Sequence, residues 1–251
     1  FLYGSGFLAF FALVVLGVYF LFVRSAPNCS DKRQNQNEEG IDCGGVCVKD
    51  CLVDTLRPVA ISGTPEFFTL PGGRASALVG IQNPNLSHGA KNFLYRVAFT
   101  GENRKVIVEN SGETFIYPGE FKYLFFPDAQ TGASAARGAE LSVNEITWAR
   151  AEVFHKPQIS VQNHRTLTVE HTVRVEGTVI SQDTITLPAV RVLAVLYDAK
   201  FGLPVGASET VLDDVAPGES RQFTILHPQI GEGNQLLDVN ATKIFVSAYR
   251  P

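Results

Sequence analysis

Hydrophobic and polar positions divide the chain into an apolar beginning and a long alternating remainder. Residues 1–23 contain no Asp, Glu, Lys, Arg, His, Asn or Gln, and Arg24 ends the run. Because an α-helix rises about 1.5 Å per residue, such a run reaches roughly 35 Å, which exceeds a bilayer hydrocarbon core of about 30 Å. The pattern predicts a transmembrane helix over residues 1–24.

A cleaved signal peptide and a buried core helix are the alternatives for this run. A signal peptide usually has an apolar region of about 7–15 residues followed by small residues. The run is longer than that, and RSAPNC after it is a poor cleavage sequence. A core helix rarely avoids every charge over such a length. We therefore expect a membrane anchor that contacts lipid through residues 1–23.

Short alternating runs predict strands from residue 53 onward. Residues 95–99 (YRVAF), 121–125 (FKYLF) and 171–175 (HTVRV) alternate apolar and polar side chains, as a strand with one buried face does. Gly, Pro, Asn and Asp interrupt the runs about every 8–12 residues. No stretch after residue 53 keeps a convincing helical period. The pattern predicts a mainly β fold.

The predicted strands form an internal repeat. Pro118-Gly119-Glu120 recurs as Pro217-Gly218-Glu219, and each triplet lies between a long strand with a turn and a closing strand. Two copies of about 95 residues each have the size of sandwich domains. Pro-Gly favours a type II turn, since proline presets φ and glycine accepts positive φ. Asp198 and Gly202 suit a hairpin turn after Tyr197.

The second copy resembles FxLYD-type domains, which are bacterial and archaeal extracytoplasmic β-sandwiches. The resemblance rests on residues 177–179 (GTV), 192–198 (VLAVLYD) and 212–223 (LDDVAPGESRQF), and it covers residues 170–250. The first copy is a weaker match over residues 75–155, because FTGE replaces the LYD triplet. The resemblance implies two tandem sandwiches of the immunoglobulin or fibronectin III type, an envelope location, and no catalytic residues.

All four cysteines lie in one short segment, at Cys29, Cys43, Cys47 and Cys51. An even, clustered set beside a predicted anchor favours two disulfides in an oxidising compartment. Zinc is the alternative, because Cys43-x3-Cys47-x3-Cys51 is loosely metal-like. The usual C-x2-C knuckle is absent, however, and no histidine lies nearby. Four cysteines allow three connectivities, and the pairing stays open.

The same segment has the oxygen-bearing side chains of a calcium site. Ca2+ takes six to eight oxygen ligands. The candidate ligands are Asp31, Asn35, Asn37, Glu39 and Asp42. Residues 29–51 resemble short cysteine-rich segments of secreted bacterial proteins, which in turn look like single thrombospondin type 3 calcium loops. The alternative is a disulfide-stapled polar linker, over residues 25–52, that binds no metal.

Charge and motifs narrow the function further. The net charge of −4 has mixed signs and no basic stretch, so we expect no nucleic-acid partner. The motifs H-E-x-x-H, G-x-S-x-G and G-x(4)-G-K-[ST] do not occur, which predicts a protein that is not an enzyme. We expect the five histidines in polar surface positions and Trp148 in the core of the first sandwich. The chain has no methionine, so Phe1 is either a processed N-terminus or follows residues that were left out.

The predicted organisation is an anchor at residues 1–24, a linker at 25–52, and sandwiches at 53–157 and 158–251. We expect a single-pass membrane protein with a cytoplasmic N-terminus and extracytoplasmic C-terminal domains, either periplasmic or at the cell surface. Its expected function is a non-catalytic scaffold that presents two sandwiches to a protein partner. The alternative is self-assembly as a pilin-like filament subunit or part of a larger membrane complex, although Ser5 stands where pilins usually carry Glu.

Overall fold

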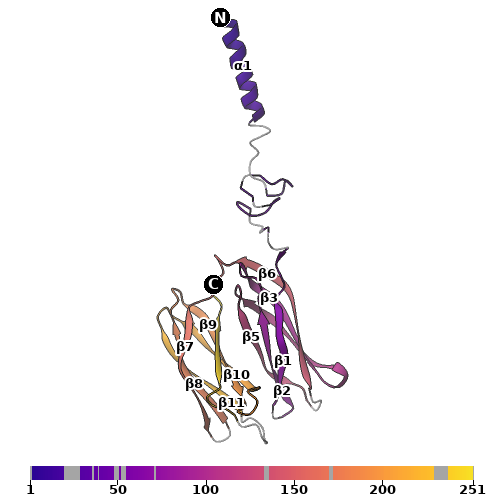
Figure 1. Cartoon of the computed structure of the whole chain (residues 1–251), viewed down its shortest axis with the longest axis vertical. Helices are drawn as coiled ribbons and strands as arrows, with labels where there is room; N and C mark the ends of the chain where they lie inside the picture. The colour runs from indigo at the N-terminus through magenta and orange to yellow at the C-terminus, as the bar shows by residue number, and fades with distance from the viewer. Residues whose placement is uncertain are drawn as a thin grey trace. The chain divides into compact units, whose positions relative to one another are not determined.

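A computed structural model describes residues 2–19, 29–35, 37–38, 40–47, 51, 55–70, 72–132, 136–169, 172–228 and 237–250. The chain divides into two compact units, Phe1–Leu56 and Arg57–Pro251. Figure 1 shows the helix and the cysteine segment of the first unit and the strands of the second. Each unit is described by itself.

The first unit begins with helix α1, Leu2–Val18. Among its described side chains, Phe7, Phe10 and Leu13 are all exposed. Among the helices of the described residues, none combines the length and the apolarity that crossing a bilayer demands. Residues 20–24 of the predicted anchor lie outside the described residues.

The second unit is built from antiparallel strands, so the predicted mainly β fold is confirmed. In the described part of this unit, four sheets have the strand orders β1-β2-β5, β4-β3-β6, β11-β8-β7 and β10-β9-β12. The strands are β1 (Ala60–Leu70), β2 (Arg74–Gln82), β3 (His88–Thr100), β4 (Val106–Ile116), β5 (Phe121–Gln130), β6 (Gly138–Arg150), β7 (Ile159–Val169), β8 (Thr172–Ser181), β9 (Leu187–Tyr197), β10 (Pro204–Val215), β11 (Ser220–Pro228) and β12 (Lys243–Ala248). A short 3-10 helix, Glu102–Arg104, lies in the β3–β4 turn.

Sheets β1-β2-β5 and β4-β3-β6 face each other and form the first sandwich. Their shared core includes Val79 of β2, Phe93 of β3 and Leu124 of β5, all buried. These residues face inward at alternate positions, as the alternating sequence pattern predicts for one face of a strand. Trp148 of β6, predicted as a core residue, is partly buried and packs against this core rather than within it.

Sheets β11-β8-β7 and β10-β9-β12 form the second sandwich in the same way. Val175 of β8, Val192 of β9 and Phe223 of β11 belong to its core. The two strand orders match position for position, with β7 to β12 in the places of β1 to β6. The internal repeat in the sequence is therefore a repeat of topology.

Each sandwich contains one Pro-Gly turn, and the two turns have the same conformation. Gly119 has φ +63° and Gly218 has φ +72°. In each turn the closing glutamate N–H donates to the carbonyl of the first turn residue, at 3.2 Å in residues 117–120 and 3.1 Å in residues 216–219. Positive φ at the third position and this hydrogen bond are what a type II turn requires. The predicted turn type is confirmed.

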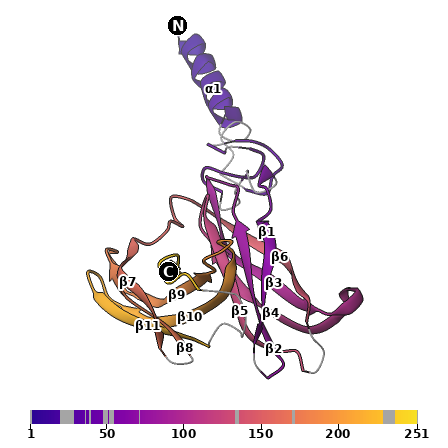
Figure 2. The same cartoon turned by 60° about the horizontal axis from the view of Figure 1, so that its bottom comes forward.

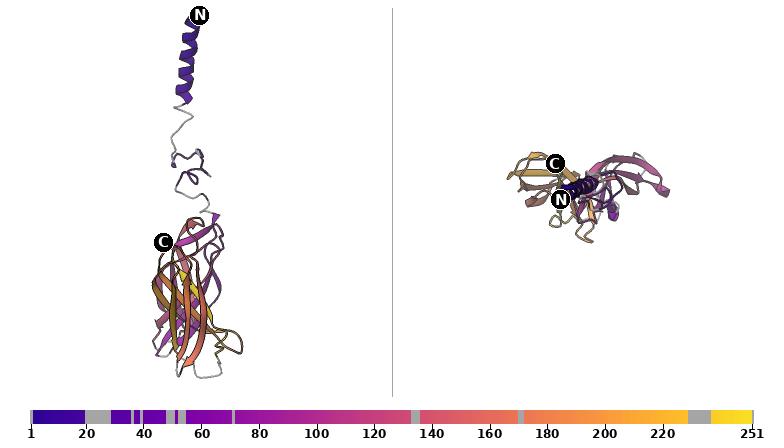
Figure 3. Two further views of the ribbon diagram at one scale, coloured as in Figure 1. Left: turned by 90° about the vertical axis from the view of Figure 1, so that its left-hand side faces the viewer. Right: turned by 90° about the horizontal axis from the view of Figure 1, so that it is seen from above.

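The two sandwiches pack against each other through the outer faces of two sheets. Phe68 and Leu78, from sheet β1-β2-β5, form one apolar cluster with Leu193, Val195 and Ala207, from sheet β10-β9-β12. Figures 2 and 3 show the two sandwiches side by side. Strands β2 and β9 are consequently buried on both faces, which accounts for the unbroken apolar run at residues 192–197.

Candidate functional site

The cysteine segment is closed by two disulfides, Cys29–Cys47 and Cys43–Cys51, with S–S distances of 2.04 and 2.11 Å. The predicted disulfides are confirmed, and zinc ligation is excluded because all four sulfurs are bonded. One group of metal-type side chains in the described residues is Cys29, Glu38 and Cys47. Two of its three members are the halves of one disulfide, so it does not hold a metal either.

The structure brings three of the five candidate calcium ligands together. Asp42 accepts the backbone N–H groups of Asp31 and Lys32 at 2.9 Å each. Asp31 in turn accepts an amide N–H from Asn35 at 2.9 Å. These bonds fold the loop by using carboxylate oxygens that a cation needs.

One buried oxygen in this loop is available to a ligand. Asn35 Oδ1 has no hydrogen-bond partner, and it belongs to the oxygen type that Ca2+ prefers. Asn37 is exposed, with φ +74°. Glu39 lies outside the described residues. The calcium site stays a prediction, with Asn35 Oδ1 as the observation in its favour.

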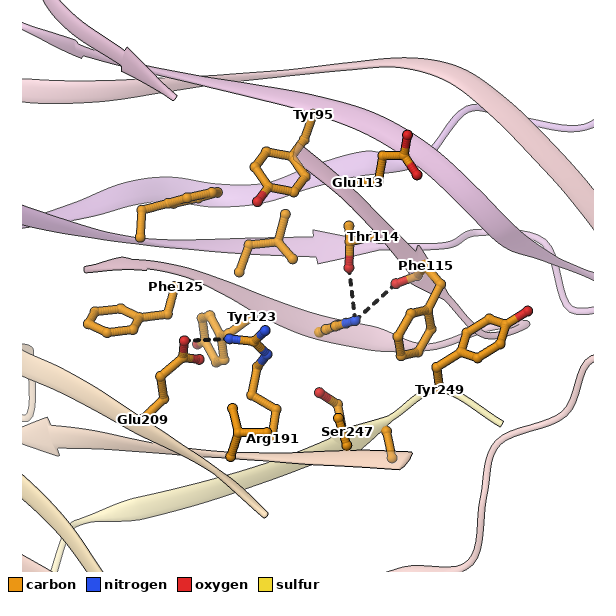
Figure 4. A pocket seen from close by; sticks show the side chains of 16 residues that line it. Tyr95, Glu113, Thr114, Phe115, Tyr123, Phe125, Arg191, Glu209, Ser247 and Tyr249 are labelled. Carbon is orange, nitrogen blue, oxygen red and sulfur yellow. Dashed lines mark hydrogen bonds and ion pairs between the residues drawn. The ribbon is translucent and has the colours of Figure 1, made fainter. Parts of the chain in front are cut away.

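A second candidate site lies where the two sandwiches meet, along strand β12. Two adjoining cavities of about 240 and 220 Å3 share Lys122, Tyr123, Arg191, Glu209 and Ser247. Figure 4 shows the first cavity between β4 and β5 on one side and sheet β10-β9-β12 on the other. We call the two cavities together the β12 groove, and its remaining lining residues include Tyr95, Glu113, Phe115, Glu120, Phe121, Lys156, Leu193, Ile244, Phe245, Val246 and Tyr249.

Lys122 is the most unusual side chain in the β12 groove, because its ammonium group is buried. It donates hydrogen bonds to the carbonyl of Phe115 at 3.0 Å and to Thr114 Oγ1 at 3.3 Å, both visible in Figure 4. The ammonium also lies 3.7 Å from the centre of the Phe115 ring. Burial lowers the pKa of Lys122 to about 8, although the negative charge of Glu120 opposes this shift.

The second sandwich repeats this arrangement with a different cation. Arg221 stands at the position equivalent to Lys122, two residues after its Pro-Gly-Glu glutamate, and it donates to the carbonyls of Asp213 and Asp214. In both sandwiches, therefore, a cationic side chain from the strand after the turn donates hydrogen bonds to backbone carbonyls at the edge of the opposite sheet. Arg221 also pairs with Glu219, whereas Lys122 forms no ion pair with the described residues.

An ion pair borders both cavities of the groove. Arg191 of β9 donates to Glu209 of β10, its diagonal neighbour on the adjacent strand, since Leu193 lies opposite Glu209. Burial raises the pKa of Glu209, and the charge and hydrogen bond of Arg191 oppose that rise. The two charges of this pair therefore compensate each other within the groove.

Tyr117 links the first sandwich to the end of β12. Its hydroxyl donates to the carbonyl of Ala248 at 3.0 Å and accepts the backbone N–H of Arg250 at 2.9 Å. Burial raises the pKa of Tyr117, and the bond from Arg250 opposes the rise. The ring stacks on Phe154 at 4.5 Å between centroids, and Tyr249 packs edge-on against Phe115 at 5.2 Å.

The expectation of surface positions is wrong for two of the five histidines. His88 and His227 are both buried. The side-chain hydroxyl of Ser208 lies 2.8 Å from His227 Nδ1, and burial lowers the pKa of His227. Gly206 makes the position possible, since a Cβ there would lie 2.6 Å from His227 Nε2.

Comparison with known proteins does not identify a family. No family model matches the chain, and no curated protein matches it. Among solved structures, the crystal structure of red sea bream transglutaminase is similar over 78% of this chain and 32% of that chain, at 9% identity and a TM-score of 0.19. A similarity of this size carries no argument about function.

Sequence reasoning missed the β12 groove and its central residues. The sequence contains one partial indication of the groove, because Lys122 and Arg221 occupy the same position after the repeated Pro-Gly-Glu turn. Tyr117 has no such signal, since Ala216 stands at the equivalent place. The contact between Tyr117 and β12 depends on how the two sandwiches pack, and the spacing of residues along one chain does not encode that packing.

Proposed function

We propose that this chain is a non-catalytic, membrane-anchored scaffold that presents two immunoglobulin-like sandwiches to a protein partner outside the cytoplasm. The observation that carries this proposal is the packing of the two sandwiches into one body. Leu78 and Val195 are 1% and 0% exposed although both point out of their own sandwich. Burial of this kind fixes the relative position of two domains, as a presenting platform needs.

The segment between the sandwiches supports the same function. Phe154 is buried just after β6, and the backbone N–H of Gln158 donates to Asp183 at 3.2 Å just before β7. Only a short connection separates these two fixed points. Loops and edges from both sandwiches can therefore be recognised together as one surface.

The apolar first residues support anchorage in a membrane. Helix α1 has no acidic residue in its first turn and no basic residue in its last, and the charge-free run continues to Val23. A helix that is apolar on all sides is stable in lipid or among other apolar helices. The disulfides fit an oxidising compartment for the cysteine segment that follows.

The same helix favours one alternative function, a filament subunit. In such a subunit the apolar faces of α1 would pack against the α1 helices of other copies, and the β-rich part would form the outer surface. Both functions predict that removing residues 1–23 releases the chain from membranes. They differ in whether the recovered partner is a different protein or a second copy of this chain.

Affinity purification of the full chain from native membranes tests the proposal. A stoichiometric protein partner that remains bound after gentle detergent extraction is the expected result. Recovery of homo-oligomers would favour the filament subunit. Recovery of the monomeric chain without any partner would overturn the scaffold function.

A further inference from the structure

Edge strands in this molecule are broken by bulges at several places. The pairing of β1 with β2 shifts register between Ser62 and Glu66, and Gly63 there has φ +77°. The pairing of β7 with β8 shifts between Gln162 and Arg165, next to Asn163 at φ +53°. Bulges of this kind prevent a foreign strand from pairing with an edge.

Strand β12 has no such protection. It pairs with β9 from Lys243 to Ala248 without a register shift. In the first sandwich, the equivalent strand β6 has a shifted register, and Glu145 within it has φ +51°. In the described part of the chain, β12 is an edge strand whose one partner strand is β9.

The hydrogen bonds of Tyr117 identify the free side of β12. Its hydroxyl bonds both the carbonyl of Ala248 and the N–H of Arg250, so these groups point away from β9. Backbone groups of alternate residues point to the same side of a strand. The N–H and C=O groups of Ile244 and Val246 therefore also point away from β9, toward the groove.

A cavity lined by both apolar and charged side chains lies beside these free backbone groups. The smaller cavity of the β12 groove, about 220 Å3, is lined by residues 244–247, Leu193 and Phe121. A protein cavity of about 150 Å3 accommodates benzene, so a phenylalanine or leucine side chain fits. The cavity continues the contact between the sandwiches, where Tyr123 packs edge-on against Phe245 at 4.8 Å.

The charged side chains at this cavity already have partners, since the Lys122 ammonium donates to the Phe115 carbonyl and to Thr114 Oγ1. Lys156 forms an ion pair with Glu120 at 2.9 Å, and Arg191 pairs with Glu209. An uncharged apolar side chain is therefore a better occupant than a charged one, which would have to displace one of these existing partners. The free edge and the cavity together therefore favour a ligand with an extended backbone and an apolar side chain.

We propose that the free edge of β12 binds an extended segment of a partner protein, which adds one strand to sheet β10-β9-β12. The segment forms backbone hydrogen bonds with Ile244 and Val246 and places an apolar side chain in the 220 Å3 cavity. This mode of recognition takes affinity from the backbone and specificity from the side-chain cavity. The inference rests on the proposed scaffold function and names its docking site.

The test uses the full chain in lipid nanodiscs and a phage-displayed library of short random peptides as the probe. Selected peptides are expected to alternate apolar and polar residues. Their binding is expected to slow hydrogen exchange at the amide of Val246. Val246→Pro removes an N–H that β9 does not use, so we expect this variant to fold. We expect it to bind the peptides at least about tenfold more weakly than the unchanged protein.

Val246→Ala is the matched control, because it shortens the same side chain and keeps the N–H. Because the Val246 side chain also lines the cavity, Val246→Ala is expected to weaken peptide binding, but much less than Val246→Pro does. Ser247→Phe is a second variant, which fills the cavity from the groove side and leaves the β12 backbone unchanged. Enriched peptides that bind V246P as tightly as the unchanged protein, or the absence of any enriched peptide, would overturn the proposal.

The outcomes separate this inference from the scaffold function. A natural partner that co-purifies equally with the unchanged chain and with V246P would leave the scaffold function intact and refute the β12 site. Peptide binding that depends on Val246, without any natural partner, would establish the site and refute the scaffold function.

Discussion

Equivalent residues of the two sandwiches reveal what single side chains do. Glu120 accepts the N–H of Tyr117 at 3.0 Å, and Glu219 accepts the N–H of Ala216 at 2.8 Å. The glutamate of each Pro-Gly-Glu turn is thus a structural acceptor that holds the turn closed. Lys122 and Arg221 follow these glutamates and differ mainly in burial. Lysine at the buried position is the residue whose charge depends on pH near neutrality.

The first prediction concerns Lys122→Met. The folded-state pKa of Lys122 is about 8, against 10.5 for an ordinary lysine. Between these values the unfolded chain holds a proton that the folded chain has released, so stability rises with pH. Relative to Lys122→Met, the free energy of unfolding of the unchanged protein should rise by up to about 1.4 kcal/mol per pH unit in this window.

Urea denaturation of both oxidised proteins at several pH values between 7 and 10.5 measures this difference. Below about pH 8 the difference should be constant, because both states are protonated there. Lys243→Met is a control at an exposed lysine, and it should show no change of slope. A difference that stays flat across the whole window would refute a buried, perturbed Lys122.

Asp198 is the second residue with a testable structural function. Its Oδ1 accepts the backbone N–H groups of Lys200 and Gly202 at 3.0 Å each, together with that of Phe201. The carboxylate therefore holds the β9–β10 turn closed. Asp198→Ala should lower the free energy of unfolding by about 1–3 kcal/mol.

Hydrogen exchange of the three turn amides gives the local readout for Asp198. They should exchange faster in Asp198→Ala than in the unchanged protein. Asp198→Asn keeps an acceptor oxygen, so its exchange rates should lie between those of the unchanged protein and of Asp198→Ala. Unchanged exchange in the alanine variant would contradict the capping role of the carboxylate.

At the scale of elements, turns and alternating strands could be predicted because their causes are local. Proline and glycine set the backbone of residues 117–120 and 216–219 whatever surrounds them, and the predicted turns are found. The strand predicted at residues 121–125 is found, but its alternation misassigns the faces, because Lys122 is buried and Phe121 is exposed. Both faces of this strand meet apolar clusters, one in the first sandwich and one between the sandwiches. The run at residues 192–197 shows no alternation, since the other sandwich covers its second face.

Glycine substitutions in the two equivalent turns should differ in cost. Gly119 and Gly218 both have positive φ, so an alanine at either is strained by about 1 kcal/mol. A Cβ at Gly119 would also lie 2.8 Å from Leu86 Cδ2, whereas Gly218 has nothing within 4 Å. Gly119→Ala should therefore lower the melting temperature more than Gly218→Ala. Equal shifts in calorimetry would show that Leu86 moves aside freely.

The disulfide-bonded segment allows a prediction about its own unit. Both disulfides lie within residues 29–51, and the core residues of the sandwiches lie in the second unit. Reduction should increase hydrogen exchange in the cysteine segment and leave the melting temperature of the sandwiches unchanged. A parallel fall in that melting temperature would show that the two units are energetically coupled.

At the scale of the whole second unit, the two sandwiches use different sheets to contact each other. The first contributes β1-β2-β5, whereas the second contributes β10-β9-β12, which is equivalent to β4-β3-β6. The two sheets left outside carry ion pairs, such as Arg96–Glu109 and Arg165–Glu176. These outer faces are therefore charged, in contrast to the apolar faces that meet between the sandwiches.

This packing, and the β12 groove with it, could not be predicted from the sequence. Leu78 and Leu193 look like any strand residue in a hydrophobic run, and nothing near them in the sequence identifies their contacts. The groove depends on the register between two sheets that are far apart in the chain. The cysteine pairing was open for the same reason, because loop closure alone does not distinguish Cys29–Cys47 from the other connectivities.

The contact between the sandwiches should make the second unit unfold as one cooperative body. Leu78 and Leu193 are buried in that contact, and truncation of a buried leucine typically costs about 2–5 kcal/mol. The double variant Leu78→Ala, Leu193→Ala removes apolar contact between the sandwiches and leaves both separate cores intact. Differential scanning calorimetry should show one transition for the unchanged protein and two for the double variant, because each sandwich then unfolds alone.

Val179→Ala, in the core of the second sandwich, is the matched control. It should lower the temperature of the single transition without dividing that transition into two. One transition in the double variant would mean that the connection through Phe154 and Gln158 is enough to couple the sandwiches.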